Sequence, residues 1–230
     1  MSYQAQYERW LHSPALSQPE KDELAALSHN AGEIEDRFFS LLQFGTAGLR
    51  GVMGVGLRRM NVHVIRYATQ AFAQVILEEG EKAAARGVAI CFDCRNNSQT
   101  FAREAAQVMA ANGIPVRLFE SLRPTPELSF AVREYGCIAG INITASHNPP
   151  QYNGYKVYGS DGCQITLDAA NAIEAEIAVV DCFMDVQTCG YQEACADGRI
   201  ESIPDSVLDA YINAVYAQRV TDIDCSGLRL

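Results

Sequence analysis

Hydrophobic and polar residues follow two different periods along this chain. Short apolar runs at 88–92 and 137–144 have the length expected of buried strands. Between such runs, apolar residues recur every three or four positions, which predicts helices. The clearest helix begins after Asn61, a residue suited to capping, and ends near Gly80. Strands alternating with helices predict an α/β domain with a largely parallel sheet.

The remaining segments extend this pattern, apart from the glycine-rich stretch 45–56, which predicts a loop leading into a helix. Ser98 is placed to cap a helix that reaches Gly113. Asn153-Gly154 predicts a tight turn. Further strands are predicted at 116–119, 155–158 and 164–166, and further helices at 125–136, 167–180 and 205–219.

The first 43 residues read as a helical extension, because Ser17 and Glu20 form a capping-box pattern and Pro19 suits a first helical turn. The predicted fold is a three-layer α/β domain at 44–204 with a mainly parallel mixed sheet. This domain is preceded by the extension 1–43. It is followed at 205–230 by the truncated beginning of a second, similar domain.

Composition narrows the classes of partner. With 48% apolar residues, the 230-residue chain can bury a large core. Its 18 basic and 28 acidic residues give a net charge of −10 without a basic run, so nucleic acid is not a predicted partner. No apolar stretch is long enough for a membrane span, and the N-terminus lacks a secretory pattern, which predicts a cytoplasmic protein. The eight cysteines are therefore expected to be reduced thiols.

The segment 144–156 carries the candidate chemistry, because it leaves the carboxyl end of a predicted strand, where α/β sheets bind ligands. Pro149 and Pro150 stiffen the segment and leave Ser146 near its tip. Phosphoryl transfer needs a positioned acceptor oxygen and nearby cations, and Ser146, Lys156 and Arg50 are of these types. An ordinary polar turn accounts for the residue types equally well.

A serine hydrolase is a poor alternative for Ser146-His147. The sequence around Ser146 lacks the G-x-S-x-G pattern of a nucleophile elbow. In addition, neighbouring side chains on an extended loop are expected to point apart.

Two longer motifs carry a resemblance to a known family. The run TASHNPPQYNGYKVYG at 144–159 resembles the phosphoserine loop of the α-D-phosphohexomutase family, and FGTAGLRG at 44–51 resembles the N-terminal substrate loop of that family. The resemblance spans about 44–230 and is closest to phosphoglucomutases and phosphopentomutases. It implies a mutase that moves a phosphoryl group between C1 and C6, or C1 and C5, of an aldose phosphate, with phosphoglucomutase as the leading expectation. The route would pass through a phosphoserine and a sugar bisphosphate, which also acts as activator.

The same resemblance implies roles for individual residues. Ser146 would carry the phosphoryl group, and its phosphate would help to bind Mg²⁺. Arg50 and Lys156 would line the catalytic cleft. For Asp93 and Arg95, bracing of the active-site loop and an ordinary surface ion pair remain equally open. Support of the loop and substrate is expected from Thr46, Gly48, His147, Asn148, Asn153, Asp93 and Arg95.

The family's fold has four domains, and several of its functional parts have no counterpart in these 230 residues. They are the DGDxDR loop that supplies the other metal ligands, the loop that selects the sugar, and the domain that grips the second phosphate. The chain alone is therefore expected to lack turnover and to self-associate through an unfinished apolar surface. A non-catalytic module that binds sugar phosphates or a partner is the alternative. The choice among glucose, mannose and pentose phosphates stays open.

Overall fold

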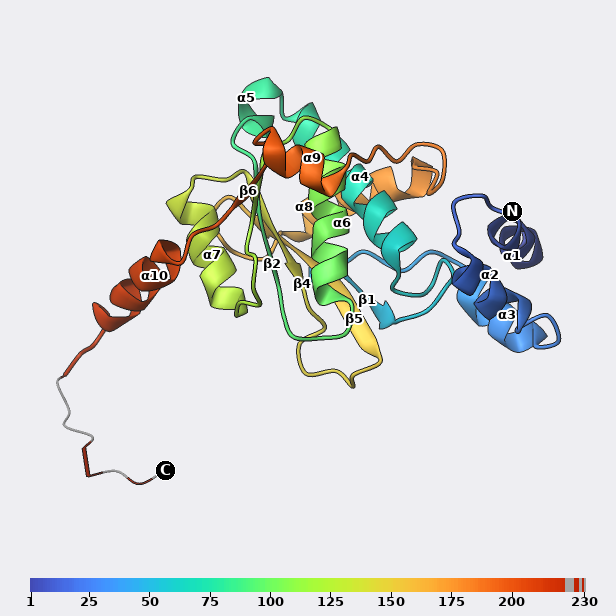
Figure 1. The fold of residues 1–230 in the computed structure, drawn as a ribbon, viewed down its shortest axis with the longest axis horizontal. Helices are drawn as coiled ribbons and strands as arrows, with labels where there is room; N and C mark the ends of the chain where they lie inside the picture. The colour runs from blue at the N-terminus through green and yellow to red at the C-terminus, as the bar shows by residue number, and fades with distance from the viewer. Residues whose placement is uncertain (222–225, 228, 230) are drawn as a thin grey trace.

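The computed structural model describes residues 1–221, 226, 227 and 229, and within them one six-stranded mixed sheet lies at the centre (Figure 1). The strands are β1 (Leu49–Val52), β2 (Val88–Phe92), β3 (Val116–Leu118), β4 (Ala139–Ile143), β5 (Tyr152–Gly159) and β6 (Ile200–Ser202). Their order is β1-β5-β4-β2-β3-β6. The four strands β4, β2, β3 and β6 run parallel, whereas β5 is antiparallel to both β4 and β1. The mainly parallel sheet predicted from the sequence is confirmed.

Ten helices occur in the described residues, and none of them is both long and apolar enough to cross a membrane. The predicted caps are confirmed at two of them. The Asn61 side chain accepts a hydrogen bond from the Val64 N–H at 2.9 Å, and Ser17 and Glu20 form a capping box. The helices are α1 (Tyr3–Leu11), α2 (Gln18–Ala25), α3 (Ala31–Phe38), α4 (Val62–Glu78), α5 (Glu81–Ala84), α6 (Ser98–Ala111), α7 (Thr125–Glu134), α8 (Leu167–Val179), α9 (Tyr191–Ala196) and α10 (Ser206–Tyr216).

Helices cover both faces of the sheet, and together with the sheet they form the three predicted layers. Helix α6 packs on β2, β3 and β4, and α4 and α8 lie beside it on the same side. Helix α7 packs on β2 and β4 from the opposite side, and α10 contacts α7 (Figure 1). Side chains of β2 point alternately toward the helices on the two faces of the sheet. Val88 and Ile90 join the core under α4 and α6, whereas Ala89 and Cys91 join the core under α7.

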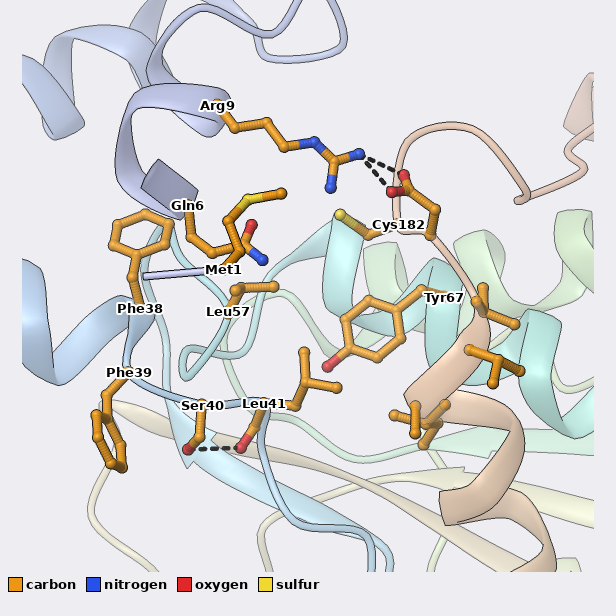
Figure 2. A pocket seen from close by; sticks show the side chains of 15 residues that line it. Met1, Gln6, Arg9, Phe38, Phe39, Ser40, Leu41, Leu57, Tyr67 and Cys182 are labelled. Atoms are coloured by element: carbon orange, nitrogen blue, oxygen red, sulfur yellow. Dashed lines mark hydrogen bonds and ion pairs between the residues drawn. The ribbon is translucent and has the colours of Figure 1, made fainter. Parts of the chain in front are cut away.

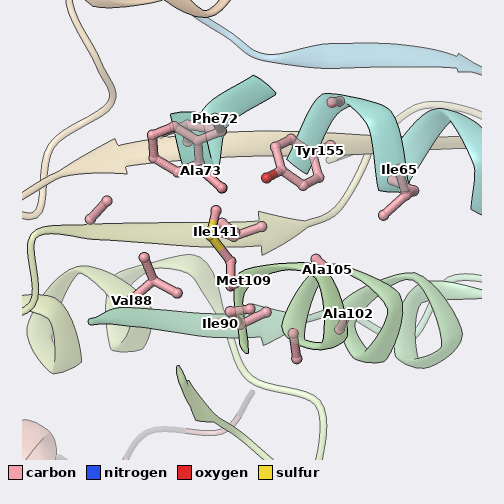
Figure 3. Close-up of a cluster of buried hydrophobic side chains, with 14 of the residues drawn as sticks. Ile65, Phe72, Ala73, Val88, Ile90, Ala102, Ala105, Met109, Ile141 and Tyr155 are labelled. Carbon is pink, nitrogen blue, oxygen red and sulfur yellow. The ribbon is translucent and has the colours of Figure 1, made fainter. Parts of the chain in front are cut away.

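The larger core lies between the sheet and helices α4 and α6, as Figure 3 shows. Ile65 and Phe72 reach it from α4 and Met109 from α6, opposite Ile141 and Tyr155 of the sheet. These side chains are at most 5% exposed, so the sheet beneath the candidate site is held by a continuous apolar layer.

The N-terminal helices have a smaller core of their own, built around the fully buried Trp10. Val55, from the glycine-rich stretch, and Leu57, just after it, complete this cluster and tie the extension to the main domain. At the other end, Val207 of α10 joins the core under α7. The proposed domain limits at 43 and 204 stay predictions. Of the predicted beginning of a second domain at 205–230, residues 222–225, 228 and 230 lie outside the described residues.

Several local predictions are wrong. The stretch 45–56 is not only a loop, because β1 forms within it against β5. Asn153 and Gly154 lie inside β5 rather than in a turn. The expected strand 164–166 is reduced to one bridge between Tyr158 and Gln164, since Thr166 caps α8.

Ser98 does not cap α6 but is its first residue, after Asn97, and its hydroxyl binds Asp93 instead. The short elements α9 and β6 were not predicted.

Candidate functional site

The loop between β4 and β5 presents Ser146 at the carboxyl end of β4. Ser146 is exposed and has a left-handed backbone with φ 57°. Its N–H donates to Thr144 Oγ1 at 2.9 Å, which fixes the turn. Its Oγ lies 3.3 Å from His147 Nδ1. The expectation that these two side chains point apart is therefore wrong, because the loop is a turn here and not extended.

The guanidinium of Arg95 binds this loop through four hydrogen bonds. Its Nη2 donates to the carbonyl oxygens of Ser146 and Asn148, both at 2.6 Å. Its Nη1 donates to those of Pro149 and Tyr152, both at 3.1 Å. The side chain is only 12% exposed. One arginine, placed just after β2, thus binds both ends of the loop that carries Ser146.

Arg95 is itself fixed by a chain of polar contacts. Asp93 Oδ1 accepts from the Arg95 backbone N–H at 2.9 Å and from the Ser98 hydroxyl at 2.8 Å, and Asp93 Oδ2 lies 3.5 Å from Arg95 Nε. Asn153 Nδ2 donates to Ser98 Oγ at 3.0 Å and to the carbonyl oxygen of Asn96 at 2.9 Å. The chain connects the end of β2, the start of α6 and β5. Arg95 therefore does more than form a surface ion pair with Asp93.

Two cations flank the loop from the β1–β5 pair. Arg50 lies opposite Gly154, and its Nη1 donates to Asn148 Oδ1 at 3.0 Å. Lys156 is two residues beyond Gly154, so Arg50 and Lys156 project from the same face of the pair. Neither forms an ion pair with a carboxylate in the part of the chain that the structure describes. Uncompensated positive charge therefore lies on the β1–β5 pair, and Arg50 brings it to the loop at Asn148, two residues after Ser146, as binding of an anion requires.

Two glycines let the turn before β1, strand β5 and the loop after β4 pack closely together. Gly48 has φ 75°, and a Cβ there would lie 1.9 Å from the Tyr155 carbonyl oxygen. Its N–H closes a short turn over Thr46, which is exposed, by donating to the Gly45 carbonyl oxygen at 2.7 Å. A Cβ at Gly154 would lie 2.6 Å from the Thr144 carbonyl oxygen. Any side chain at either position would push the loops apart.

Among the described residues, the arrangement offers an exposed hydroxyl, a loop held by hydrogen bonds and two cations without carboxylate partners, but no cluster of metal ligands. No group of three His, Cys, Asp or Glu side chains able to bind a metal occurs within residues 1–221, which make up almost all of the described structure. The nearby carboxylate of Asp93 is occupied by Arg95 and Ser98. As it stands, the site can hold a phosphate group against Ser146 and its cations.

Sequence reasoning missed two contributors to this site. Thr144 looked like the end of a strand, and Ser98 looked like a helix cap. The signal for Thr144 was its place two residues before Ser146, the spacing at which a hydroxyl can accept from the backbone N–H of a turn. The spacing Asp93–Ser98 gave no comparable signal, because the hydrogen bond between them depends on how α6 leaves the sheet.

Known proteins match this chain in both sequence and structure. Residues 41–181 match the family model described as phosphoglucomutase/phosphomannomutase, alpha/beta/alpha domain I. A phosphopentomutase of Mus musculus is 42% identical over 70% of this chain and 27% of its own length. A phosphoglucomutase of Staphylococcus saprophyticus is 36% identical over 76% of this chain and 31% of its own length.

The solved structures include one from Thermus thermophilus that is named, provisionally, as a phosphomannomutase. It superposes with a TM-score of 0.63 at 31% identity, over 77% of this chain and 36% of that one. The chain thus spans about a third or less of the curated relatives described above.

Proposed function

Because this chain belongs to the phosphoglucomutase/phosphomannomutase family, we propose that its intact protein is a phosphosugar mutase with Ser146 as the phosphoryl carrier. The observation that carries the proposal is the presentation of Ser146. Its exposed hydroxyl stands on a loop fixed by four hydrogen bonds from Arg95. Arg50 and Lys156 add positive charge where a phosphate would lie. The proposed reaction relocates a phosphoryl group between C1 and C6 of a hexose, or C1 and C5 of a pentose.

In the proposed reaction, a hydroxyl oxygen of the sugar phosphate forms a bond to phosphorus as the bond from phosphorus to Ser146 Oγ breaks. The product is a sugar bisphosphate, which turns over and returns its other phosphoryl group to Ser146. The sugar hydroxyl gives up its proton to water as its oxygen bonds to phosphorus, and Ser146 Oγ takes up a proton as it leaves; His147 Nδ1, 3.3 Å from that oxygen, is within reach to donate it. Arg50 and Lys156 offset the negative charge that gathers in the transition state. A rigid loop matters because catalysis of this reaction consists mainly of positioning.

Mg²⁺ belongs to the proposal only for the intact protein. When bound, it would neutralise phosphate charge during transfer. The described residues do not form a site for it, since they hold no cluster of three suitable ligands. This chain would contribute one ligand, a phosphate oxygen on Ser146, and the other ligands would come from elsewhere in the intact protein. The 230 residues alone are accordingly proposed to be inactive.

The test uses the full-length protein with wild-type Ser146 and with Ser146→Ala. We expect peptide mapping to find phosphate on Ser146 after incubation with glucose 1,6-bisphosphate. Turnover of glucose 1-phosphate should fall by several orders of magnitude in the variant, while stability changes by less than about 1 kcal/mol because the residue is exposed. Full activity with Ser146 unmodified would contradict the proposal. Ribose 1-phosphate and mannose 1-phosphate, assayed in parallel, identify the preferred sugar.

We also propose that the 230-residue chain self-associates through α10. Ile212, Val215 and Tyr216 on this helix are 40%, 53% and 61% exposed, which is unusual for large apolar side chains of one short helix. Light scattering at increasing concentration should show oligomers, and a Val215→Glu variant should be monomeric. A monomer at all concentrations would contradict this proposal.

A further inference from the structure

The carboxyl ends of β2 and β3 are a second place in the sheet where a ligand is expected. The chain leaves β2 toward α6, on one face of the sheet, and leaves β3 toward α7, on the opposite face. In open α/β sheets, ligands bind where neighbouring strands lead to opposite faces in this way. Ser146 follows β4, which lies on the other side of β2. The proposed mutase function therefore leaves the position between β2 and β3 unused.

A hollow of about 340 Å³ lies at this position, beside the contact between α6 and α9 (Figure 1). Its floor includes Phe92, the last residue of β2, and Leu118, the last residue of β3. Gln99 and Arg103 line it from α6, and Tyr191 lines it from α9. Ligand pockets usually measure about 300–1,000 Å³, so this hollow has room for a small organic molecule.

Two opposite charges line this hollow without ionic partners. Arg103 places its guanidinium over the Tyr191 ring, 5.0 Å from the ring centre, and no carboxylate of the described residues pairs with it. Glu120 follows β3, is exposed, and pairs with no cation in the part of the chain that the structure describes. Arg103 and Glu120 also form no ion pair with each other, which leaves both charges available to a ligand.

Figure 2 shows a cavity in which the charges are paired instead, where the N-terminal extension meets the end of α8. There, one guanidinium nitrogen of Arg9 binds both carboxylate oxygens of Asp181 at 2.5 Å, so the two charges offset each other. The hollow beside α9 differs because its positive and negative groups both lack a partner. A ligand with complementary charges would supply both partners.

We propose that the hollow beside α9 binds a small zwitterion, a molecule with a carboxylate at one end and an ammonium group at the other. Arg103 binds the carboxylate, and Glu120 binds the ammonium group. The carbon chain between these two groups lies against Leu118 and the Tyr191 ring. This site is separate from the Ser146 loop and does not depend on the proposed phosphoryl transfer.

The test compares three probes of similar length with the 230-residue chain. The probe 4-aminobutyrate carries both charges, butyrate only the negative one, and butylamine only the positive one. NMR titration should show saturable shifts of the Gln99 and Tyr191 amides with 4-aminobutyrate. Because an exposed ion pair contributes little, this probe should bind about two- to fivefold more tightly than either of the others. Arg103→Gln should abolish its advantage over butylamine, and Glu120→Gln should abolish its advantage over butyrate.

Arg117 provides a matched control, because its guanidinium also lies over a tyrosine ring, 4.8 Å from the centre of Tyr135, but outside the hollow. Arg117→Gln should leave both advantages unchanged. Absence of saturable shifts, equal binding of the three probes to the wild type, or advantages that survive the Arg103 and Glu120 variants would overturn the proposal. So would loss of either advantage in Arg117→Gln, because the charges would then act at long range and not within the hollow. Arg103 and Glu120 are exposed, so their variants should keep the fold, as urea unfolding will check.

Discussion

Replacing Arg95 by lysine separates the geometry of the guanidinium from its charge. The guanidinium donates to four carbonyl oxygens of the loop between β4 and β5 at 2.6–3.1 Å. Lysine keeps a positive charge beside Asp93 but carries its donors on a single nitrogen, which cannot reach all four oxygens. We therefore expect the loop to open more often while the sheet stays intact.

The expected change in the free energy of loop opening follows from what happens to the carbonyl groups that lose their hydrogen bonds. The loop is largely exposed, so these groups return to water, and each bond is counted at about 0.5–1.5 kcal/mol, the net value for a hydrogen bond. If lysine retains two of the four bonds, the free energy of loop opening falls by about 1–3 kcal/mol. At about 1.4 kcal/mol per factor of ten, amide exchange in the loop should accelerate roughly 5- to 150-fold.

Hydrogen exchange measured by NMR tests this directly. Two amides report on the loop, because the Asn148 N–H donates to Ala145 and the Tyr152 N–H donates to Pro149, at 3.2 and 3.0 Å. Amides of β2 serve as the internal reference for global unfolding. Both loop amides should exchange faster in Arg95→Lys, and the β2 amides should not.

A matched control is available in Arg86, which donates to the carbonyl oxygens of Gly136 and Cys137 at 2.8 and 3.1 Å in a different loop. Arg86→Lys should leave exchange at Asn148 and Tyr152 unchanged. Unchanged exchange in Arg95→Lys, or equal acceleration in both variants, would refute the view that the Arg95 fork holds the loop.

Three other predictions address stability and catalysis. Gly48→Ala should lower the free energy of unfolding by about 3 kcal/mol or more, since the added Cβ would meet backbone atoms. Gly80→Ala, at positive φ but in open space, should lower it by only about 1–2 kcal/mol. Urea unfolding of the two variants measures the difference. Burial lowers the pKa of His63 below its usual 6.5. The stability that neutral His63 contributes above pH 6.5 is therefore lost as the pH falls through the lowered pKa. Unfolding measured at several pH values should show a smaller loss of stability on acidification in His63→Gln than in the wild type. In the intact mutase, Lys156→Met and Arg50→Ala should each slow phosphoryl transfer by roughly 100-fold; a loss of substrate affinity alone, in single-turnover assays, would make them binding residues.

The sequence sufficed to locate the loop and Ser146, because both depend on local signals: a buried strand, two prolines and a hydroxyl in order. The support of that loop was not derivable in the same way. Arg95 meets its four acceptors across 51 to 57 positions of sequence, and no local pattern reports such a contact. Only the parallel pairing of β2 with β4 brings the two loops together.

The fold shows the same division between local and tertiary signals. Helices with clear apolar spacing, such as α4, were predicted almost to their ends. Strand β1 was missed because Gly51 interrupts a segment of four residues whose extended form depends on β5 as partner. Strand β6 was missed because three residues are too few to show a period.

The left-handed backbone at Ser146 also restricts which hydroxyl amino acid can stand at the tip of the loop. Threonine would offer the same oxygen, but its additional methyl group makes it β-branched, and β-branched residues at positive φ are strained outliers. Glycine would relieve the backbone and has no oxygen to offer. Serine combines the oxygen with the smallest conformational penalty, so the shape of the main chain selects the amino acid as strictly as the reactivity of its side chain does.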